Sequence, residues 1–190
     1  MKYVLSGIGM LFGLVFVFML MTVGVVSAAN KPKRDNEQVL PGKGDTPKKA
    51  IIIYQPAITK VTTRMAQQLA AGLNEGGYEV TVNHPGKHLS MDLSGYDLII
   101  FGSPTYAGQL AKALTKYMEQ VCPELAKAPG KAPRLVLFAT GGLEQTEEFD
   151  RLADILSGLN VVRKIKFSPG PQEKNDQIAY DLGIALAKND

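Results

Sequence analysis

The sequence predicts an α/β domain in three layers, a five-stranded parallel sheet with helices on both faces, preceded by one hydrophobic helix. From residue 50 onward, short apolar runs of the kind found in fully buried strands alternate with helical stripes of apolar residues. Strands that alternate with helices form an open parallel sheet between two helical layers. Right-handed crossovers leave few topologies, and strand order 2-1-3-4-5 is the best match for this number of strands.

Each of the five expected strands is a short run of apolar or alternating residues. They are Ala50–Tyr54, Tyr78–Asn83, Asp97–Phe101, Arg134–Ala139 and Val161–Phe167. Apolar residues at steps of three and four predict a helix after the first, third, fourth and fifth strands. The link between the second and third strands is short enough for a single helical turn. We therefore expect one domain over residues 50–190.

The N-terminal 29 residues predict a transmembrane anchor or a signal segment. Tyr3–Ala29 contains no charged residue and is longer than the apolar core of about 7 to 15 residues in a signal peptide. It meets the length of about 20 residues that a spanning helix needs. Small residues at 26–29 leave cleavage and export open as the alternative. Basic residues at 31–34 favour an anchored domain that faces the cytoplasm.

Residues 30–49 predict a flexible linker, because proline, glycine and charged residues dominate the segment. It holds six basic and three acidic residues, whereas residues 50–190 hold fourteen basic and fifteen acidic ones. A nearly neutral domain offers no nucleic-acid surface. One cysteine, Cys122, and two histidines, His84 and His88, are too few for a disulfide or a typical zinc site.

Three loops are expected side by side at one edge of the sheet. They follow the first, third and fourth strands and comprise Gln55–Thr63, Gly102–Gly108 and Thr140–Leu143. Ligands of open α/β sheets bind beyond the carboxyl ends of the strands. Small and hydroxyl residues gather in all three loops, so this edge is the expected binding site for a flat ligand with a phosphate tail.

The first loop leads into a helix N-terminus, which attracts anions through its free N–H groups and the helix dipole. The hydroxyl groups of Thr59, Thr62 and Thr63 and the charge of Lys60 are candidate phosphate ligands. An alternative role for Thr62 or Thr63 is to cap the helix.

In the second loop, the aromatic ring of Tyr106 is expected to stack on a planar ligand, and Gly108 allows a close approach of the backbone. The alternative is that Pro104 and Gly108 only shape the turn. In the third loop, Thr140-Gly141-Gly142 leaves backbone amides unobstructed.

The motifs IIIYQP, FGSPTYAG and FATGG, in this order, resemble those of the flavodoxin family. The resemblance covers residues 50–187. It implies bound FMN and electron transfer without a catalytic residue or a metal. The residues that would bind the cofactor are Gln55, Thr59, Lys60, Thr62, Thr63, Ser103, Pro104, Thr105, Tyr106, Gly108, Thr140, Gly141 and Gly142.

The resemblance implies a protein that transfers electrons or carries out a flavin-dependent reduction with an unidentified redox partner. Together with the hydrophobic N-terminal segment, it leads us to expect that this protein is tethered to a membrane. The phosphate loop departs from the family pattern, because Ile58 and Val61 stand among its polar positions. The alternative function is therefore a flavodoxin-like scaffold with a degenerate phosphate loop that binds a protein at the membrane.

Overall fold

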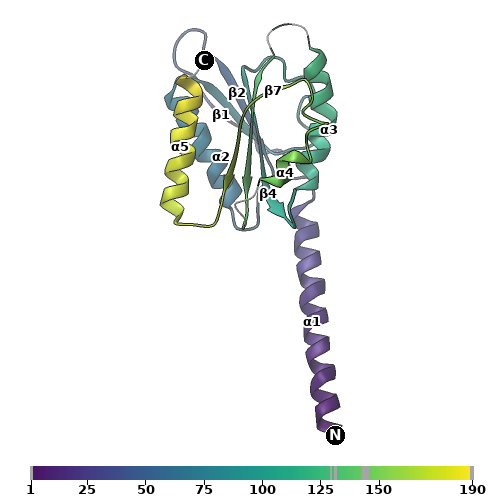
Figure 1. Cartoon of the computed structure of the whole chain (residues 1–190). Helices are drawn as coiled ribbons and strands as arrows, with labels where there is room; N and C mark the ends of the chain where they lie inside the picture. Colours follow the sequence, from purple (N-terminus) through teal and green to yellow (C-terminus); the bar gives the residue numbers. More distant parts are fainter. Residues whose placement is uncertain (1, 129, 131, 143–145, 189–190) are drawn as a thin grey trace.

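A twisted parallel sheet runs through the middle of the domain (Figure 1). The computed structural model describes residues 2–128, 130, 132–142 and 146–188, with side chains described from residue 13 onward. Its five main strands are β2 (Lys49–Tyr54), β3 (Glu79–Asn83), β4 (Leu98–Tyr106), β6 (Arg134–Thr140) and β7 (Asn160–Phe167). They are all parallel and lie in the order β3-β2-β4-β6-β7. The predicted order 2-1-3-4-5 is confirmed.

Two short strands that the sequence pattern did not predict extend this sheet. β1 (Gln38–Leu40) pairs antiparallel with β3 at one edge. β5 (Gln109–Leu110) turns back on the end of β4 and forms a hairpin with it. β4 is longer than the expected third strand because Ser103 and Pro104 continue its pairing with β6.

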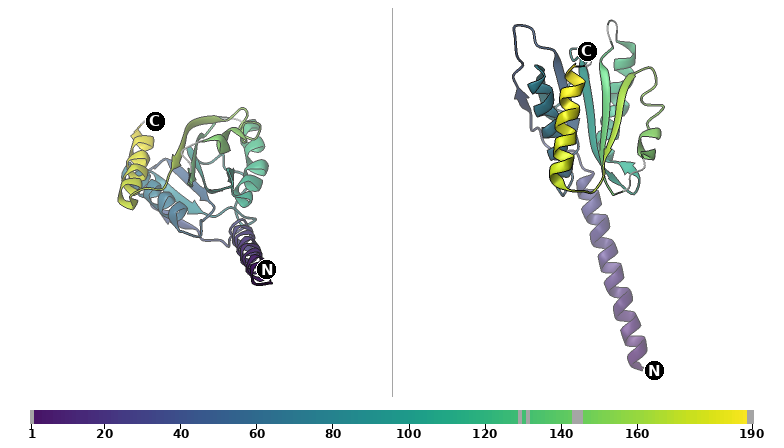
Figure 2. Two further views of the ribbon diagram at one scale, coloured as in Figure 1. Left: turned by 60° about the horizontal axis from the view of Figure 1, so that its bottom comes forward. Right: turned by 60° about the vertical axis from the view of Figure 1, so that its left-hand side comes forward.

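Helices cover both faces of the sheet, as predicted (Figures 1 and 2). α2 (Val61–Glu75) and α5 (Gln172–Lys188) lie together on one face. α3 (Lys112–Lys127) and α4 (Glu147–Asp150) cover the other. The core accordingly forms two apolar clusters, one on each side of the sheet. β2 shows how: Ile51 and Ile53 face the α3 side, while Ile52 faces the α2 side, as the alternation of side chains along a strand requires.

The fourth connection contains less helix than its apolar stripe predicts. α4 has four residues, and a series of turns continues through Gly158, which has a positive φ of 79°. Phe149, Leu152 and Leu156 are nevertheless buried in the core. Apolar periodicity indicates which side chains face the core. Consecutive turns can place those side chains in the core as well as a regular helix can.

The N-terminal helix α1 (Lys2–Ala29) leaves the domain at the end where the parallel strands finish (Figures 1 and 2). Its described apolar side chains, such as Leu14 and Phe18, are exposed. Within the described part of the chain, no helix combines the length and hydropathy that crossing a bilayer requires, so the expected transmembrane helix is not supported there.

The segment after α1 lies against the domain along part of its length, although its composition predicts a flexible linker. We call residues 29–40 the strap. The side chain of Gln55 donates hydrogen bonds to the carbonyl oxygens of Ala29 and Lys31, over 2.6 and 3.0 Å. Further along, β1 adds the strap to the sheet. The contacts that hold this segment are hydrogen bonds of polar and backbone groups. Composition alone therefore cannot distinguish it from a flexible linker.

Candidate functional site

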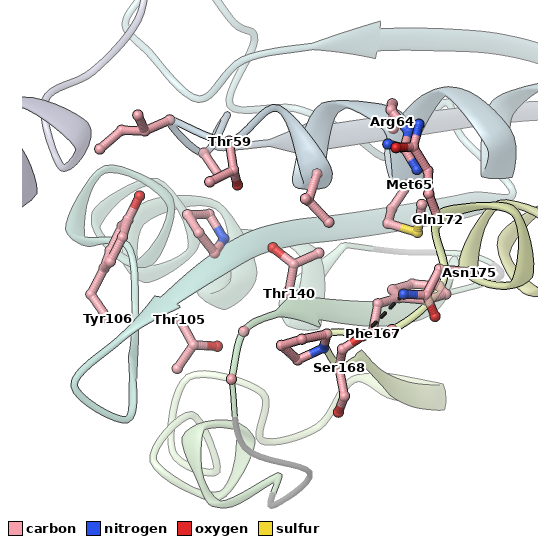
Figure 3. Close-up of a pocket in the computed structure, with 18 residues that line it drawn as sticks. Thr59, Arg64, Met65, Thr105, Tyr106, Thr140, Phe167, Ser168, Gln172 and Asn175 are labelled. Carbon is pink, nitrogen blue, oxygen red and sulfur yellow. Dashed lines mark hydrogen bonds between the residues drawn. The ribbon is translucent and has the colours of Figure 1, made fainter.

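A cavity of about 540 Å³ opens at the carboxyl ends of the strands, where the ligand site was predicted. Figure 3 shows Tyr106 and Thr105 on one side of it, Ser168 and Asn175 on the other, and Thr140 between them. Its walls come from four loops and two helix starts. The lining residues are Ala57, Ile58, Thr59, Val61, Arg64, Met65, Pro104, Thr105, Tyr106, Thr140, Gly141, Gly142, Phe167, Ser168, Pro169, Gly170, Gln172 and Asn175.

Seven of the thirteen predicted site residues line this cavity, and all three predicted loops contribute. The seven are Thr59, Pro104, Thr105, Tyr106, Thr140, Gly141 and Gly142. The other six, which do not line it, are Gln55, Lys60, Thr62, Thr63, Ser103 and Gly108. Several of these six shape the site from behind. Gln55 holds the strap, and the hydroxyl groups of Thr62 and Thr140 share a hydrogen bond of 2.7 Å.

The first loop makes a tight turn into α2. The backbone N–H of Lys60 donates to the carbonyl of Ala57 over 3.2 Å, and Lys60 takes the left-handed conformation, with φ of 59°. Lys60 is the N-cap residue and makes no side-chain capping bond. The alternative in which Thr62 or Thr63 caps the helix is therefore wrong. The N–H groups of the first helical turn have no partner within the helix, which leaves them to solvent or to a ligand.

The second loop is the β4–β5 hairpin. Tyr106 pairs with Gln109, and the two residues between them, Ala107 and Gly108, have φ of 49° and 70°. Two consecutive positive φ values are the mark of a type I′ turn. Gly108 thus serves the turn. Ser103 closes the base of the loop, since its hydroxyl oxygen accepts a hydrogen bond of 2.8 Å from the N–H of Ala111.

The hydroxyl oxygen of Tyr106 is buried and finds no hydrogen bond of good geometry among the described residues. Burial raises the pKa of this phenol, and the nearby backbone of Ile58 opposes the rise only in part. The group therefore stays protonated over the physiological range and keeps a donor at the wall of the cavity. A buried polar atom of this kind costs free energy unless a partner completes it.

The third loop approaches the second very closely. A Cβ atom placed on Gly141 would lie 3.0 Å from the Cβ of Thr105. Only glycine fits this position without displacing its neighbour. The N–H of Gly141 donates to the carbonyl of Phe167 over 3.3 Å, whereas a Cβ on Gly142 would meet no described atom within 4 Å. Leu143, the last residue expected in this loop, lies outside the described residues. The third loop thus presents backbone to the cavity.

A fourth wall, which the sequence analysis missed, follows β7. Asn175 on α5 donates from its side-chain amide to the carbonyl of Ser168 over 3.0 Å (Figure 3). Arg64 on α2 bridges to Asp176 on α5 over 2.8 Å. The sequence does contain a signal for this loop, because Ser168 begins a run of proline and glycine directly after a strand. The predicted site included only the loops after the first, third and fourth strands.

A buried ion pair lies beside the second loop. Lys166 on β7 and Glu148 on α4 are 2.7 Å apart, with side chains only 5% and 3% exposed. The hydroxyl of Thr105 donates to the same carboxylate over 3.3 Å. Thr105 is therefore held from both sides, by this pair and by Gly141. Such pairs give no periodic signal in a sequence.

A family model described as a flavodoxin domain matches residues 59–180. The match covers more than half of the chain, so the chain belongs to the flavodoxin family, and the predicted family is confirmed. Flavodoxin homologues bind FMN. No curated protein sequence matches the chain.

Solved structures share the fold over most of the chain. A flavodoxin from the domain Archaea is 22% identical, with a TM-score of 0.58 over 74% of this chain and 97% of the other. The two-electron reduced flavodoxin of Megasphaera elsdenii is 21% identical, with a TM-score of 0.59 over 73% and 98%. The rubredoxin:oxygen oxidoreductase of Desulfovibrio gigas is 20% identical, with a TM-score of 0.54 over 75% and 37%. These similarities establish the fold.

Proposed function

We propose that the cavity binds FMN and that the protein is an electron carrier or a flavin-dependent reductase. The observation that carries the proposal is the convergence of the three predicted loops on one cavity of about 540 Å³ in a chain of the flavodoxin family. FMN supplies reversible one- or two-electron chemistry when it is bound, and the protein tunes it through contacts and charge.

The residues around the cavity fit this cofactor. The buried hydroxyl of Tyr106 lacks a good partner, and the close approach of Gly141 to Thr105 leaves a backbone edge at the cavity. At the other end, the start of α2 offers free N–H groups beside the exposed Lys60. A phosphate is attracted to such a helix start. The cavity therefore combines hydrogen-bond donors for a phosphate at one end with the aromatic side chains of Tyr106 and Phe167 in its walls.

Each group has a distinct task in this proposal. Thr59 and the first N–H groups of α2 hold the phosphate, with Lys60 adding positive charge. The aromatic ring of Tyr106 and the backbone of the third loop flank the flavin ring and exclude water from it. No side chain is needed as nucleophile or base, so the remaining requirement is a redox partner that exchanges electrons with the bound cofactor.

A scaffold without FMN is the second candidate. Ile58 and Val61 line the cavity at the phosphate end, and Ile58 is 60% exposed. Apolar side chains there offer no hydrogen bonds to a phosphate. A module that binds a partner protein through this apolar rim would accept these residues more readily than a phosphate site would.

Titration of the full-length protein with FMN separates the two candidates. The first predicts quenched flavin fluorescence and a saturable change in the flavin absorption bands. Tyr106→Ala is expected to weaken binding or shift the spectrum, and Tyr106→Phe is the matched control because it keeps the ring. A folded full-length protein that neither quenches nor perturbs FMN would exclude the first candidate.

We further propose that residues 1–29 tether the protein to a membrane, with the domain on the cytoplasmic side. The support is the sequence from Tyr3 to Ala29, which has no charged residue and whose side chains lie partly outside the described residues. Export after cleavage is the alternative. Alkaline extraction of membranes and N-terminal sequencing of the protein distinguish the two: a cleaved chain begins near residue 30 and stays in the supernatant.

A further inference from the structure

The N-terminus of α3 is held by groups from outside the helix. Its N-cap residue, Ala111, has no side chain that can cap. Instead, Ser103 accepts from the N–H of Ala111, and the side-chain oxygen of Asn30 in the strap accepts from the N–H of Lys112 over 2.9 Å. A bond of this kind takes the place of the usual N-cap.

Asn30 joins two helix ends. Its side-chain nitrogen donates to the carbonyl of Val26, in the last turn of α1, over 3.0 Å, while its oxygen receives the N–H from α3. These opposite partners leave one orientation for the amide, since the nitrogen must face a carbonyl and the oxygen an N–H. Gln55 fixes the strap on either side of Asn30 through the carbonyls of Ala29 and Lys31.

The helix end that Asn30 holds comes directly after the β4–β5 hairpin. β5 ends at Leu110, and α3 begins at Lys112, so a displacement of the helix end displaces the hairpin. A second cavity, of about 450 Å³, separates this hairpin from the last turns of α1, and both Asn30 and Tyr106 line it. Tyr106 therefore stands between two cavities and receives little packing from the α1 side.

We propose that Asn30 is a positioning residue for the flavin site: by capping α3 it holds the hairpin, and so holds Tyr106 at the wall of the FMN cavity. The inference rests on the proposed FMN site. The strap would thereby affect the affinity for FMN. Tyr106 has a cavity on each side, so its position depends on the hairpin that the capped end of α3 holds.

The test compares three variants of the full-length protein by FMN titration. Asn30→Ala removes the cap and is expected to raise the Kd for FMN about fivefold. This ratio corresponds to the free energy that a typical N-cap contributes. Asn30→Asp keeps an oxygen acceptor for the N–H of Lys112 but loses the donor to Val26. Because the proposal assigns the positioning to the cap of α3, this variant is expected to stay within about twofold of the natural protein. Asn74→Ala is the matched control. Its amide donates to the carbonyls of Pro41 and Tyr78, over 2.7 and 3.0 Å, beside the amino end of β3.

Amide hydrogen exchange provides a readout that needs no FMN. Asn30→Ala is expected to speed exchange across residues 105–112, whereas Asn30→Asp and Asn74→Ala leave it unchanged. If the natural protein does not bind FMN, the proposed function fails, and exchange still decides whether Asn30 holds the hairpin. Equal Kd values for Asn30→Ala and the natural protein, or equal exchange rates, would overturn the positioning role.

Discussion

Ala107 occupies a backbone conformation that its side chain disfavours. It has φ of 49° in the tight turn of the β4–β5 hairpin and is exposed. A left-handed conformation costs an L-residue about 1–2 kcal/mol, and asparagine or glycine adopts it more readily. Asn-Gly is also the preferred pair for a type I′ turn. The natural sequence has Ala-Gly and keeps this strain beside Tyr106.

Ala107→Asn is therefore expected to raise the free energy of unfolding by about 0.5–1 kcal/mol. Chemical denaturation of the full-length protein measures the change. Ala71→Asn is the control, because Ala71 is exposed in the middle of α2 and asparagine is a poorer helix former there. The two substitutions should shift stability in opposite directions, and a loss of stability for Ala107→Asn would contradict the type I′ assignment.

The environments of some residues can be predicted from the sequence, and those of others cannot. Cys122 lies on the buried apolar face of α3, and burial raises the pKa of its thiol to about 12, which makes the thiol unreactive. Gln55 was expected at the ligand, yet its amide holds the strap. The residue type indicates that a buried side-chain amide needs hydrogen-bond partners. Which groups become those partners depends on the fold.

At the scale of elements, α2 and α5 pack closely through two glycines. A Cβ on Gly72 would clash with the carbonyl oxygen of Tyr180, and a Cβ on Gly183 would clash with the carbonyl oxygen of Leu69. The backbones of the two helices therefore lie nearly in contact. This contact places the start of α5, with its part of the fourth wall, beside the start of α2.

Gly72→Ala is expected to destabilise the protein by about 1–3 kcal/mol, the usual cost of overpacking, since the backbone cannot yield as a side chain can. The midpoint of urea denaturation reports the loss. Gly95→Ala should be nearly neutral, because a Cβ there meets nothing within 4 Å and φ is not positive. Equal midpoints for the two variants would mean that α2 and α5 are further apart than described.

His84, which follows β3 and contacts the strap at Arg34, responds to pH. The ring of His84 packs against Tyr54, with centroids 4.9 Å apart, and its Nδ1 lies 3.2 Å from the carbonyl of Arg34, so this nitrogen carries the proton and donates. The other ring nitrogen is buried and has no hydrogen bond within the part of the chain that the structure describes. Burial is the main cause that lowers the pKa of His84 below 6.5, and His88 and Lys33 act in the same direction.

A lowered pKa in the folded state means that the unfolded chain takes up the proton first. The stability that depends on neutral His84 is therefore complete above about pH 6.5 and falls as the pH drops through 6.5 toward the lower folded pKa. One group contributes at most about 1.4 kcal/mol per pH unit. Denaturation at pH 7.5 and 5.5 measures the loss. His84→Phe, which keeps the ring contact, should reduce it, whereas His88→Gln should retain it.

The elements themselves could be predicted where apolar residues repeat. The five main strands and their order follow from buried apolar runs such as Ile51–Ile53, because a strand covered on both faces has one dominant sequence signature. β1, β5 and the strap could not be predicted. Pairs such as Asn36 with Asn83 join distant polar residues, and one hydrogen bond between side chain and backbone leaves no repeat to detect.

At the scale of the whole molecule, the strap is part of the fold, although its composition is that of a linker. β1 pairs with the outer edge of β3 from Gln38 to Leu40, and Asn83 at the end of β3 bonds to both Asp35 and Asn36. An uncovered edge strand is a template for pairing with another chain. The strap therefore covers the one edge of the parallel sheet that β3 would otherwise leave open.

A chain that begins at Thr46 is expected to be less stable than one that begins at Asn30 by about 2–4 kcal/mol, the sum of a few hydrogen bonds at about 1 kcal/mol each. It should also self-associate through β3. Denaturation and light scattering of the two chains provide the comparison, with the longer chain as the control. A monomeric short chain of equal stability would show that the strap contributes nothing to the folded domain.

The attachment of the strap also has a geometric consequence. The amide of Gln55 holds the segment directly after α1, and Gln55 follows the strand β2 that ends at the cavity edge. These two hydrogen bonds tie the carboxyl end of α1 to the carboxyl end of β2. A surface or partner that held α1 would therefore also influence the direction in which the cavity opens. Under the proposed function, electron exchange would then favour molecules that reach the cavity from the side of the emerging helix.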